Sequence, residues 1–278
     1  MSDLPDRPEL VRLLSDQFDA LADLVGGLDE DRWRIPSPLP GWTVFDVIGH
    51  IVGTESLLLG DKPPARAAQA PDIDVKTLPH VRNDIGALNE IWLQRLRPLS
   101  GTELLQMYHE VIDRRRKALS AMDDQAWLAP SQSPVGEVPY ARFMRVRLFD
   151  CWMHELDIAD ALGVRVEEGG ARGEVAFTEF AQSLPRVLAK RGGAPAGSLI
   201  TLRLTGPLAR TLHIEVDDRA AYVTAPDREA TVTLELDSGL LVRLGGGRLD
   251  PETALDRITF HGDAELGRQL ARNLAFTI

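Results

Sequence analysis

The segment from Tyr140 to Leu162 constrains the fold more than any other part of this chain. It contains neither proline nor glycine, and its apolar residues recur every three to four positions. This spacing predicts one long helix. Asp150 and His154 stand four residues apart within it, one turn above each other on a face that also carries apolar residues. The segment therefore predicts an acid and an imidazole directed together into a helical interior.

A second helix is predicted at residues 43–59, and it brings another imidazole. Thr43 followed by Asp46 is typical of a helix start, where the two side chains cap the first turn. His50 falls beside the apolar stripe of this helix. If His50 meets the acid and imidazole of the longer helix, the three groups can share one divalent cation. Three protein ligands leave a coordination position open for a water or a thiol, as in a reactive metal site.

The spacing alone leaves two simpler interpretations open. A histidine on an apolar helix face is often a hydrogen-bonded core residue, and Asp and His four residues apart can form a pair within one helix. Three unpaired polar groups in an apolar interior would be costly, whereas a shared cation would satisfy all of them. The metal site is therefore a hypothesis that needs support from elsewhere in the chain.

The overall pattern predicts two modules, residues 1–165 and residues 166–278. Helical periodicity dominates the first module, which we expect to be an up-down helical bundle. Besides the two helices above, we expect a first helix ending at Gly26, helices at 81–97 and 102–121, and loops at 60–79 and around Pro130, Pro134 and Pro139.

The second module is expected to be a smaller α/β domain that contains an antiparallel sheet. A glycine-rich stretch at 163–173 precedes it, followed by a helix at 173–191 that breaks near Pro185. Short alternating segments then predict strands. They lie at 199–205, 211–216, 220–224 and 230–236, and the closing residues predict a helix, a short strand, Gly262-Asp263 and a final helix.

Two segments of the chain resemble a known family. Residues 31–51 (DRWRIPSPLPGWTVFDVIGHI) and 147–157 (RLFDCWMHELD) carry the patterns Pro-Gly-Trp-Thr-Val-x-Asp-x-x-x-His and Arg-x-x-acid-x-Trp-x-His-x-x-Asp. These patterns resemble DinB-like metal-dependent proteins, particularly the mycothiol-dependent maleylpyruvate isomerase family. The closing run of the chain resembles sterol-carrier-like modules. The resemblance implies a DinB-like metal-binding bundle in residues 1–165 and a sterol-carrier-like α+β domain in residues 166–278.

The resemblance also implies a set of metal ligands and a cofactor. In the family, the His of the first motif and the acid and His of the second bind the metal, and these positions are His50, Asp150 and His154 here. It implies a divalent metal, for which we expect Zn²⁺, and mycothiol as co-substrate. The isomerases of the family carry Glu where this chain has Asp150. The shorter side chain must bring its helix closer or bind through a different oxygen geometry.

Charge and hydropathy argue against several partners. Lys and Arg number 31 against 42 Asp and Glu, and the net charge of −11 argues against nucleic acid or an anionic membrane surface. No apolar run approaches the roughly 20 residues that cross a bilayer. The first residues lack the basic and apolar regions of a signal peptide. We therefore expect a cytoplasmic protein.

Arg147 is the candidate catalytic residue outside the ligand set. It stands three residues before Asp150, where it can form a structural salt bridge with that carboxylate or meet an anionic substrate. His80 is the first reserve as a metal ligand. We rank it ahead of His109, His213 and His261.

The single cysteine and the tryptophans are expected to be structural. Cys151 excludes an intrachain disulfide and a thiolate cluster, and we expect it to be a small buried hydrophobe. Four tryptophans are expected to anchor the core. They are Trp42, Trp92, Trp127 and Trp152.

These observations lead to two functional hypotheses. The favoured one is a metal-dependent enzyme that uses mycothiol on a small electrophilic or unsaturated acid. In a maleylpyruvate-type isomerase the thiolate would add to a conjugated cis double bond, allow rotation and leave. In an S-transferase it would attack an electrophile and stay attached. The alternative is a non-catalytic metal- or apolar-ligand-binding protein whose second module holds the ligand.

Overall fold

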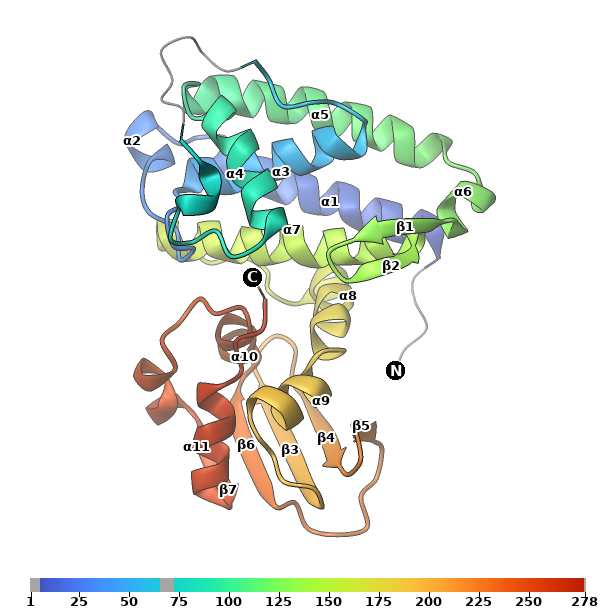
Figure 1. Ribbon diagram of the computed structural model, residues 1–278, viewed down its shortest axis with the longest axis vertical. Helices are drawn as coiled ribbons and strands as arrows, with labels where there is room; N and C mark the ends of the chain where they lie inside the picture. Colours follow the sequence, from blue (N-terminus) through green and yellow to red (C-terminus); the bar gives the residue numbers. More distant parts are fainter. Residues whose placement is uncertain (1–5, 66–72, 278) are drawn as a thin grey trace. The chain divides into compact units, whose positions relative to one another are not determined.

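The computed structural model describes residues 6–65 and 73–277 and divides into two compact units, whose sequences join between residues 166 and 167 (Figure 1). Part of the loop predicted at 60–79, residues 66–72, lies outside the described residues. No helix among the described residues is long and apolar enough to cross a membrane.

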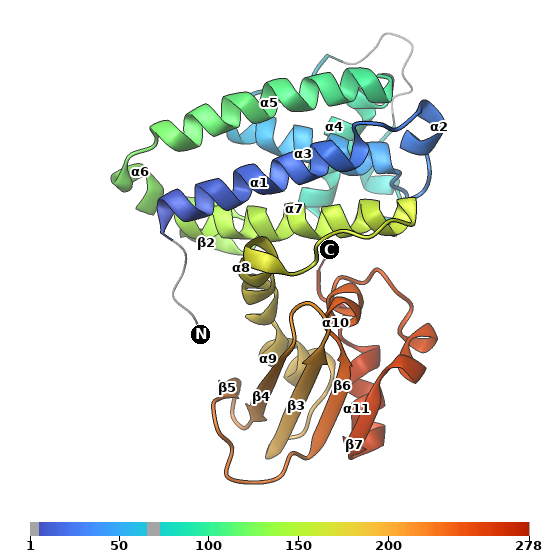
Figure 2. The ribbon, with the colours of Figure 1, turned by 180° about the vertical axis from the view of Figure 1, so that it is seen from behind.

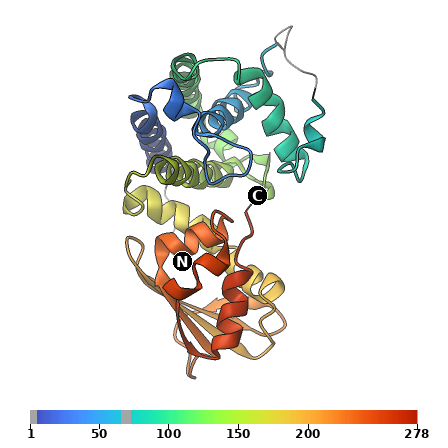
Figure 3. The same ribbon diagram turned by 90° about the vertical axis from the view of Figure 1, so that its left-hand side faces the viewer.

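The first unit is a bundle of four long helices. They are α1 (Arg7–Val25), α3 (Val44–Leu58), α5 (Gly101–Ala121) and α7 (Tyr140–Leu162). Both α1 and α3 pack against α5 and α7, which closes the bundle, and Figure 3 looks nearly along these helices. The shorter elements are α2 (Glu30–Trp33), η1 (Val75–Thr77), α4 (Asp84–Leu96) and α6 (Asp124–Leu128). The predicted helical bundle is confirmed.

The helix α7 has the bounds that its sequence predicted. It starts directly after Pro139 and ends at Gly163, whose φ of 67° is a left-handed conformation that glycine adopts without strain. Most of its side chains are buried, because it lies against α1 on one side and α3 on another. An interior helix of this kind can hold polar groups only where partners satisfy them.

The loop predicted around the three prolines before α7 is wrong in part, because it contains a β-hairpin. The strands β1 (Pro130–Ser133) and β2 (Gly136–Pro139) pair in an antiparallel register that sets Ser133 opposite Gly136. Pro130 and Pro139 stand opposite each other at the far end of the ladder, where a missing N–H is tolerated. Gly136, at a φ of 97°, allows the tight turn. The sequence pattern predicted a plain loop because prolines stand at the ends of both strands.

The second unit contains a five-stranded sheet. Its strands are β3 (Ser198–Thr205), β4 (Arg210–Val216), β5 (Ala220–Val223), β6 (Val232–Asp237) and β7 (Thr259–Gly262). They are ordered β5-β4-β3-β6-β7 and pair antiparallel, except for the parallel neighbours β3 and β6 (Figure 2). The predicted antiparallel sheet is confirmed. The β3–β6 pair is parallel because β6 does not follow β3 through a hairpin but returns past β4 and β5.

Helices flank the strands of this unit in sequence. They are α8 (Gly170–Ala181), α9 (Leu184–Arg186), the π-helical turn η2 (Val187–Arg191), α10 (Ser238–Gly245), the 3₁₀ turns η3 (Pro251–Thr253) and η4 (Leu255–Arg257), and α11 (Ala264–Arg272). The break expected near Pro185 falls between α8 and α9, and Asp263 caps α11 as Gly262-Asp263 suggested.

Candidate metal centre

The start of α3 sets the position of His50. Thr43 accepts a hydrogen bond from the backbone N–H of Asp46, and the Asp46 carboxylate accepts from the backbone N–H and hydroxyl of Thr43. This capping box fixes the first turn of the helix. The other oxygen of Asp46 accepts from Arg97 Nε at 2.7 Å, which ties this turn to the end of α4. His50 follows one turn later and is buried.

Asp150 and His154 come from α7, one turn apart on one face, and both lie close to His50 of α3. Among the described residues, these three form a group that could hold a metal ion, with one ligand atom from each lying within 4.8 Å of the others. His50 Nε2 lies 3.2 Å from Asp150 Oδ2, and His154 Nε2 lies 3.7 Å from Asp150 Oδ1. The two imidazoles are buried, whereas the Asp150 side chain is 33% exposed. The cluster therefore opens toward solvent at its carboxylate.

The donor set fits a divalent metal such as zinc. His50 Nε2 and His154 Nε2 approach different oxygens of Asp150, at 3.2 and 3.7 Å, and two imidazole nitrogens with one carboxylate are a donor set that zinc accepts. Burial lowers the pKa of His50, so its neutral form, which has a lone pair for a metal, is favoured. His50 Nδ1 is buried without a hydrogen-bond partner among the described residues.

Asp157 determines which nitrogen of His154 faces the cluster. His154 Nδ1 lies 2.9 Å from Asp157 Oδ2, and the Asp157 side chain is almost fully buried. A carboxylate at this distance accepts the Nδ1 proton, so that Nε2 keeps its lone pair and points toward Asp150. Carboxylates commonly orient metal-binding imidazoles in this way. Asp157 is the last residue of the second sequence motif, but the spacing did not reveal this role.

Arg147 is part of a buried ion-pair cluster. Its Nη1 donates to Asp150 Oδ2 at 2.6 Å, while Nε and Nη2 contact Glu55 Oε1 at 2.9 and 2.8 Å. Glu55 also accepts from Arg115 Nε at 2.7 Å, and the side chains of Arg115 and Arg147 are no more than 5% exposed. The geometry favours the salt-bridge interpretation of Arg147 over direct contact with a substrate.

The same arrangement keeps Asp150 ionised. Burial opposes the charged carboxylate, but the pKa of Asp150 lies well below its usual range, chiefly because the Arg147 guanidinium stabilises the anion. The two arginines and the two carboxylates of the cluster balance in charge, so Asp150 presents an anionic ligand without leaving a lone buried charge.

Trp42 lies against both imidazoles, a contact that the sequence did not reveal. Its ring centroid is 5.4 Å from that of His50 and 6.3 Å from that of His154. The indole Nε1 donates to Glu90 Oε1 at 2.8 Å. We predicted Trp42 as a core anchor; it is instead partly exposed and forms a wall of the cluster. The only sequence signal was its place in the first motif, directly before the helix cap.

His80, the reserve ligand, is engaged elsewhere. Its Nε2 lies 2.9 Å from Glu90 Oε1, the same oxygen that accepts from Trp42. Arg97 also donates to Glu90, at 2.9 Å. Burial raises the pKa of Glu90, but the hydrogen bonds from Arg97 and His80 outweigh it and lower the pKa overall. His80 therefore supports the wall formed by Trp42 and is not among the three residues that could share an ion.

Family models match both units of the chain. The mycothiol maleylpyruvate isomerase N-terminal domain matches residues 14–159, and the C-terminal domain of the same isomerase family matches residues 174–269. The chain belongs to the mycothiol-dependent maleylpyruvate isomerase family. The two halves of this family match, one after the other, the helical unit that holds the cluster and the unit that holds the sheet. The resemblance drawn from the two motifs is confirmed.

Relatives in sequence include two uncharacterized proteins from different strains of Mycobacterium tuberculosis. Each is 34% identical to this chain over 157 residues, which are 55% of this chain and 55% of the relative. The chain thus spans about half the length of the curated relatives it matches.

Similar solved structures include a mycothiol-dependent maleylpyruvate isomerase and a mutant of it in which one histidine is replaced by alanine. The isomerase structure is 20% identical, with a TM-score of 0.60, and the mutant is 19% identical, with a TM-score of 0.59. Each comparison covers 94% of this chain and 95% of the other. At this identity the likeness shows that the isomerase family fold extends over both units.

In this member of the isomerase family, Cys151 is buried inside the bundle. Burial raises the pKa of its thiol far above the usual range, so the thiol stays protonated and is a poor nucleophile. This agrees with the prediction of a small buried hydrophobe. The remaining histidines, His109, His213 and His261, are not among the described residues that could share a metal ion.

Proposed function

We propose that this chain is a metal-dependent, mycothiol-using enzyme, either an isomerase of the maleylpyruvate type or an S-transferase, whose metal ligands are His50, Asp150 and His154. The observation that carries the proposal is the convergence of these three groups, with ligand atoms within 4.8 Å of one another, in a chain of this family. Three protein ligands and an exposed carboxylate edge leave room for a further ligand from solution.

The residues of the cluster have separable roles in this proposal. His50 and His154 supply neutral nitrogen donors, and Asp150 supplies a negative charge. Asp157 holds the His154 ring and its proton, while Arg147 holds the Asp150 carboxylate in its ionised form. A bound zinc ion would supply the positive charge that keeps a small thiol ionised near neutral pH.

The proposed partners are mycothiol and a small electrophilic or unsaturated acid. The two candidate reactions differ in the fate of the thiol, which an isomerase returns unchanged and an S-transferase incorporates into the product. Mass balance of the thiol therefore separates them. The likeness to a solved mycothiol-dependent maleylpyruvate isomerase supports isomerisation as the first reaction to test.

The test combines metal analysis, thiol binding and turnover. Elemental analysis of the purified protein should find one zinc or similar divalent ion per chain, and calorimetry should show mycothiol binding only to the metal-loaded form. Mycothiol with maleylpyruvate, or with a generic electrophile, should then give metal-dependent turnover. A protein that binds neither metal nor thiol, and turns over neither substrate, would refute the proposal.

A further inference from the structure

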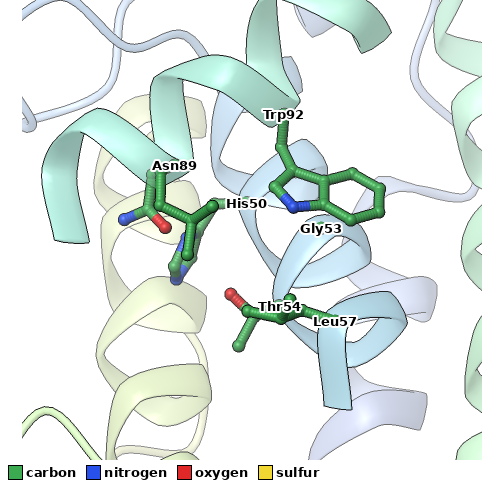
Figure 4. A pocket seen from close by; sticks show the side chains of 7 residues that line it. His50, Gly53, Thr54, Leu57, Asn89 and Trp92 are labelled. Atoms are coloured by element: carbon green, nitrogen blue, oxygen red, sulfur yellow. The ribbon is translucent and has the colours of Figure 1, made fainter. Parts of the chain in front are cut away.

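A groove between α3 and α4 adjoins the proposed metal centre. It is lined by one face of α3 and by one turn of α4, it is open to solvent, and its volume of about 10 Å³ has room for one water-sized group, such as a single ligand oxygen. Its lining residues are His50, Gly53, Thr54, Leu57, Leu88, Asn89 and Trp92 (Figure 4). Because His50 belongs to both, a small molecule in the groove would lie beside the metal ligands.

The groove has a built floor. A β-carbon on Gly53 would stand 2.8 Å from the Trp92 ring, and one on Gly49 would stand 2.9 Å from Leu93. Both distances are too short for real contacts, so these two glycines, one turn apart, allow α4 to pack directly on the backbone of α3. Trp92 is thereby pressed against α3 as the floor of the groove.

Trp92 contributes an unused hydrogen-bond donor. The residue is 4% exposed, and its indole Nε1 has no hydrogen-bond partner among the described residues. In Figure 4 this nitrogen lies on the ring edge nearest His50 and Thr54. Indole N–H groups donate only, and a buried one nearly always finds an acceptor. The Thr54 hydroxyl and the Asn89 amide line the same groove and can add further hydrogen bonds.

The lining also defines the class of ligand. It contains no Asp, Glu, Lys or Arg, so a carboxylate placed here would lose water without gaining a counter-charge. Leu57 and Leu88 are partly exposed and provide apolar walls. The donors and walls together suit an uncharged oxygen acceptor, such as an amide carbonyl or a hydroxyl, attached to a small apolar group.

We propose that this groove is a binding subsite of the metal centre, in which Trp92 Nε1 donates a hydrogen bond to an uncharged oxygen of the bound thiol or of the acid substrate. The subsite rests on the proposed function, because its ligand would reach the metal beside His50. The acceptor chemistry is shared by the two sources, and the experiment separates them.

The test compares two neutral thiols on the zinc-loaded protein. N-acetylcysteamine carries an amide oxygen, whereas ethanethiol has no such acceptor. Trp92→Phe keeps a ring on the floor and removes the N–H, so it should weaken N-acetylcysteamine about fivefold in calorimetry and leave ethanethiol unchanged. Thr54→Val should weaken the amide thiol in the same direction, and Ile85→Ala, an exposed change on α4 outside the groove, should affect neither thiol.

Nuclear magnetic resonance gives a direct readout. The indole N–H signal that disappears in Trp92→Phe should shift in wild type when N-acetylcysteamine is added, and should not shift with ethanethiol. If turnover is present, a raised KM for the thiol alone assigns the groove to the thiol, and a raised KM for maleylpyruvate alone assigns it to the acid.

The outcomes keep the two proposals apart. Metal-dependent thiol binding with an unmoved Trp92 signal, and KM values unchanged by Trp92→Phe, would overturn the subsite and leave the metal centre intact. A Trp92 signal that shifts with N-acetylcysteamine in metal-free protein would support the groove, even if the metal proposal failed. Absence of thiol binding and of any shift would overturn both.

Discussion

The two units of this molecule differ in what they bury. Among the described residues of the second unit, one acidic, basic or histidine side chain is buried, that of Glu179. The core of this unit consists of leucine, valine, isoleucine, alanine and phenylalanine. Among its own described residues, the helical unit buries ten acidic, basic or histidine side chains. They are Asp46, His50, Glu55, Glu90, Arg115, Arg145, Arg147, His154, Glu155 and Asp157.

This difference shows where the helical unit departs from a structure optimised for stability alone. Buried ionisable groups cost free energy unless they are paired, and apolar residues of similar volume often stabilise a core as well or better. The core of the sheet unit is built almost entirely from such apolar residues. In the helical unit, the ion pairs that join Arg115, Glu55, Arg147 and Asp150 lie beside His50 and His154, and such a group of interacting charges is the arrangement expected of a reactive site.

The largest effect in this contrast should come from removing a proposed ligand. His154→Ala deletes one of three protein ligands, and no neighbour on α7 can replace it, so the purified variant should lose most of its metal. His50→Ala should behave alike. Elemental analysis checks both, with thermal unfolding of the metal-free proteins as a control for folding. Stoichiometric metal in both variants would show that the site is misassigned.

Arg147→Met should cause a large loss of stability. The change leaves Glu55 with one arginine and Asp150 with none, so the unfolding free energy should fall by about 3–5 kcal/mol. Urea denaturation measures this. In the sheet unit, Arg203→Met breaks an exposed pair with Glu235 and should cost less than about 1 kcal/mol. Equal losses in the two variants would mean that the burial of the first pair is energetically unimportant.

A second comparison uses the apolar core of the sheet unit as control. Leu202→Ala, at a fully buried position of β3, should destabilise by about 2–5 kcal/mol, comparable to Arg147→Met, without changing metal content. A drop in bound metal in this variant would contradict the assignment of the site to the helical unit alone.

Asp157→Asn should have a smaller effect, confined to metal affinity. The variant removes the negative charge that holds the Nδ1 proton of His154, and loss of such a supporting group lowers affinity by about 10–100-fold. Competition with a chelating indicator measures it. Asp160→Asn, an exposed change on the same helix, is the matched control and should leave affinity unchanged.

Asp150→Glu should have the smallest effect. If α7 lies where the family's longer acid needs it, Glu will bind metal about as well as Asp. If α7 has moved closer, the extra methylene will overpack the site, with a cost of about 1–3 kcal/mol. We expect tolerance of Glu and reduced affinity in Asp150→Asn, which keeps an oxygen but loses the charge. Equal metal affinity of wild type and Asp150→Asn would remove Asp150 from the ligand set.

The parts of this molecule that depend on local sequence could be predicted from it. Helical spacing brought Asp150 and His154 to one face, and the Thr43–Asp46 pattern located the start of α3. Their meeting with His50 required the family motifs, because spacing within one helix says nothing about another helix 100 residues away.

Contacts between distant elements could not be predicted. Glu55, the partner of Arg147, is 92 residues away in sequence and looked like an ordinary polar residue near a helix end. Trp42 is a residue type that usually anchors a core, and only the fold shows that its ring faces two imidazoles. The unpaired indole of Trp92 is likewise visible only after α4 has packed on the two glycines of α3.

The line of alternating charges in the helical unit has a consequence for how the bundle assembles. Glu55 of α3 bridges Arg115 of α5 and Arg147 of α7, which in turn reaches Asp150. In a partly formed bundle, with α3 docked on α7 but α5 absent, Glu55 would be buried with Arg147 and without Arg115. Such intermediates are penalised, so the three helices should form in one concerted folding transition. Unfolding followed by a probe on α5 and one on α7 should then give superimposable curves.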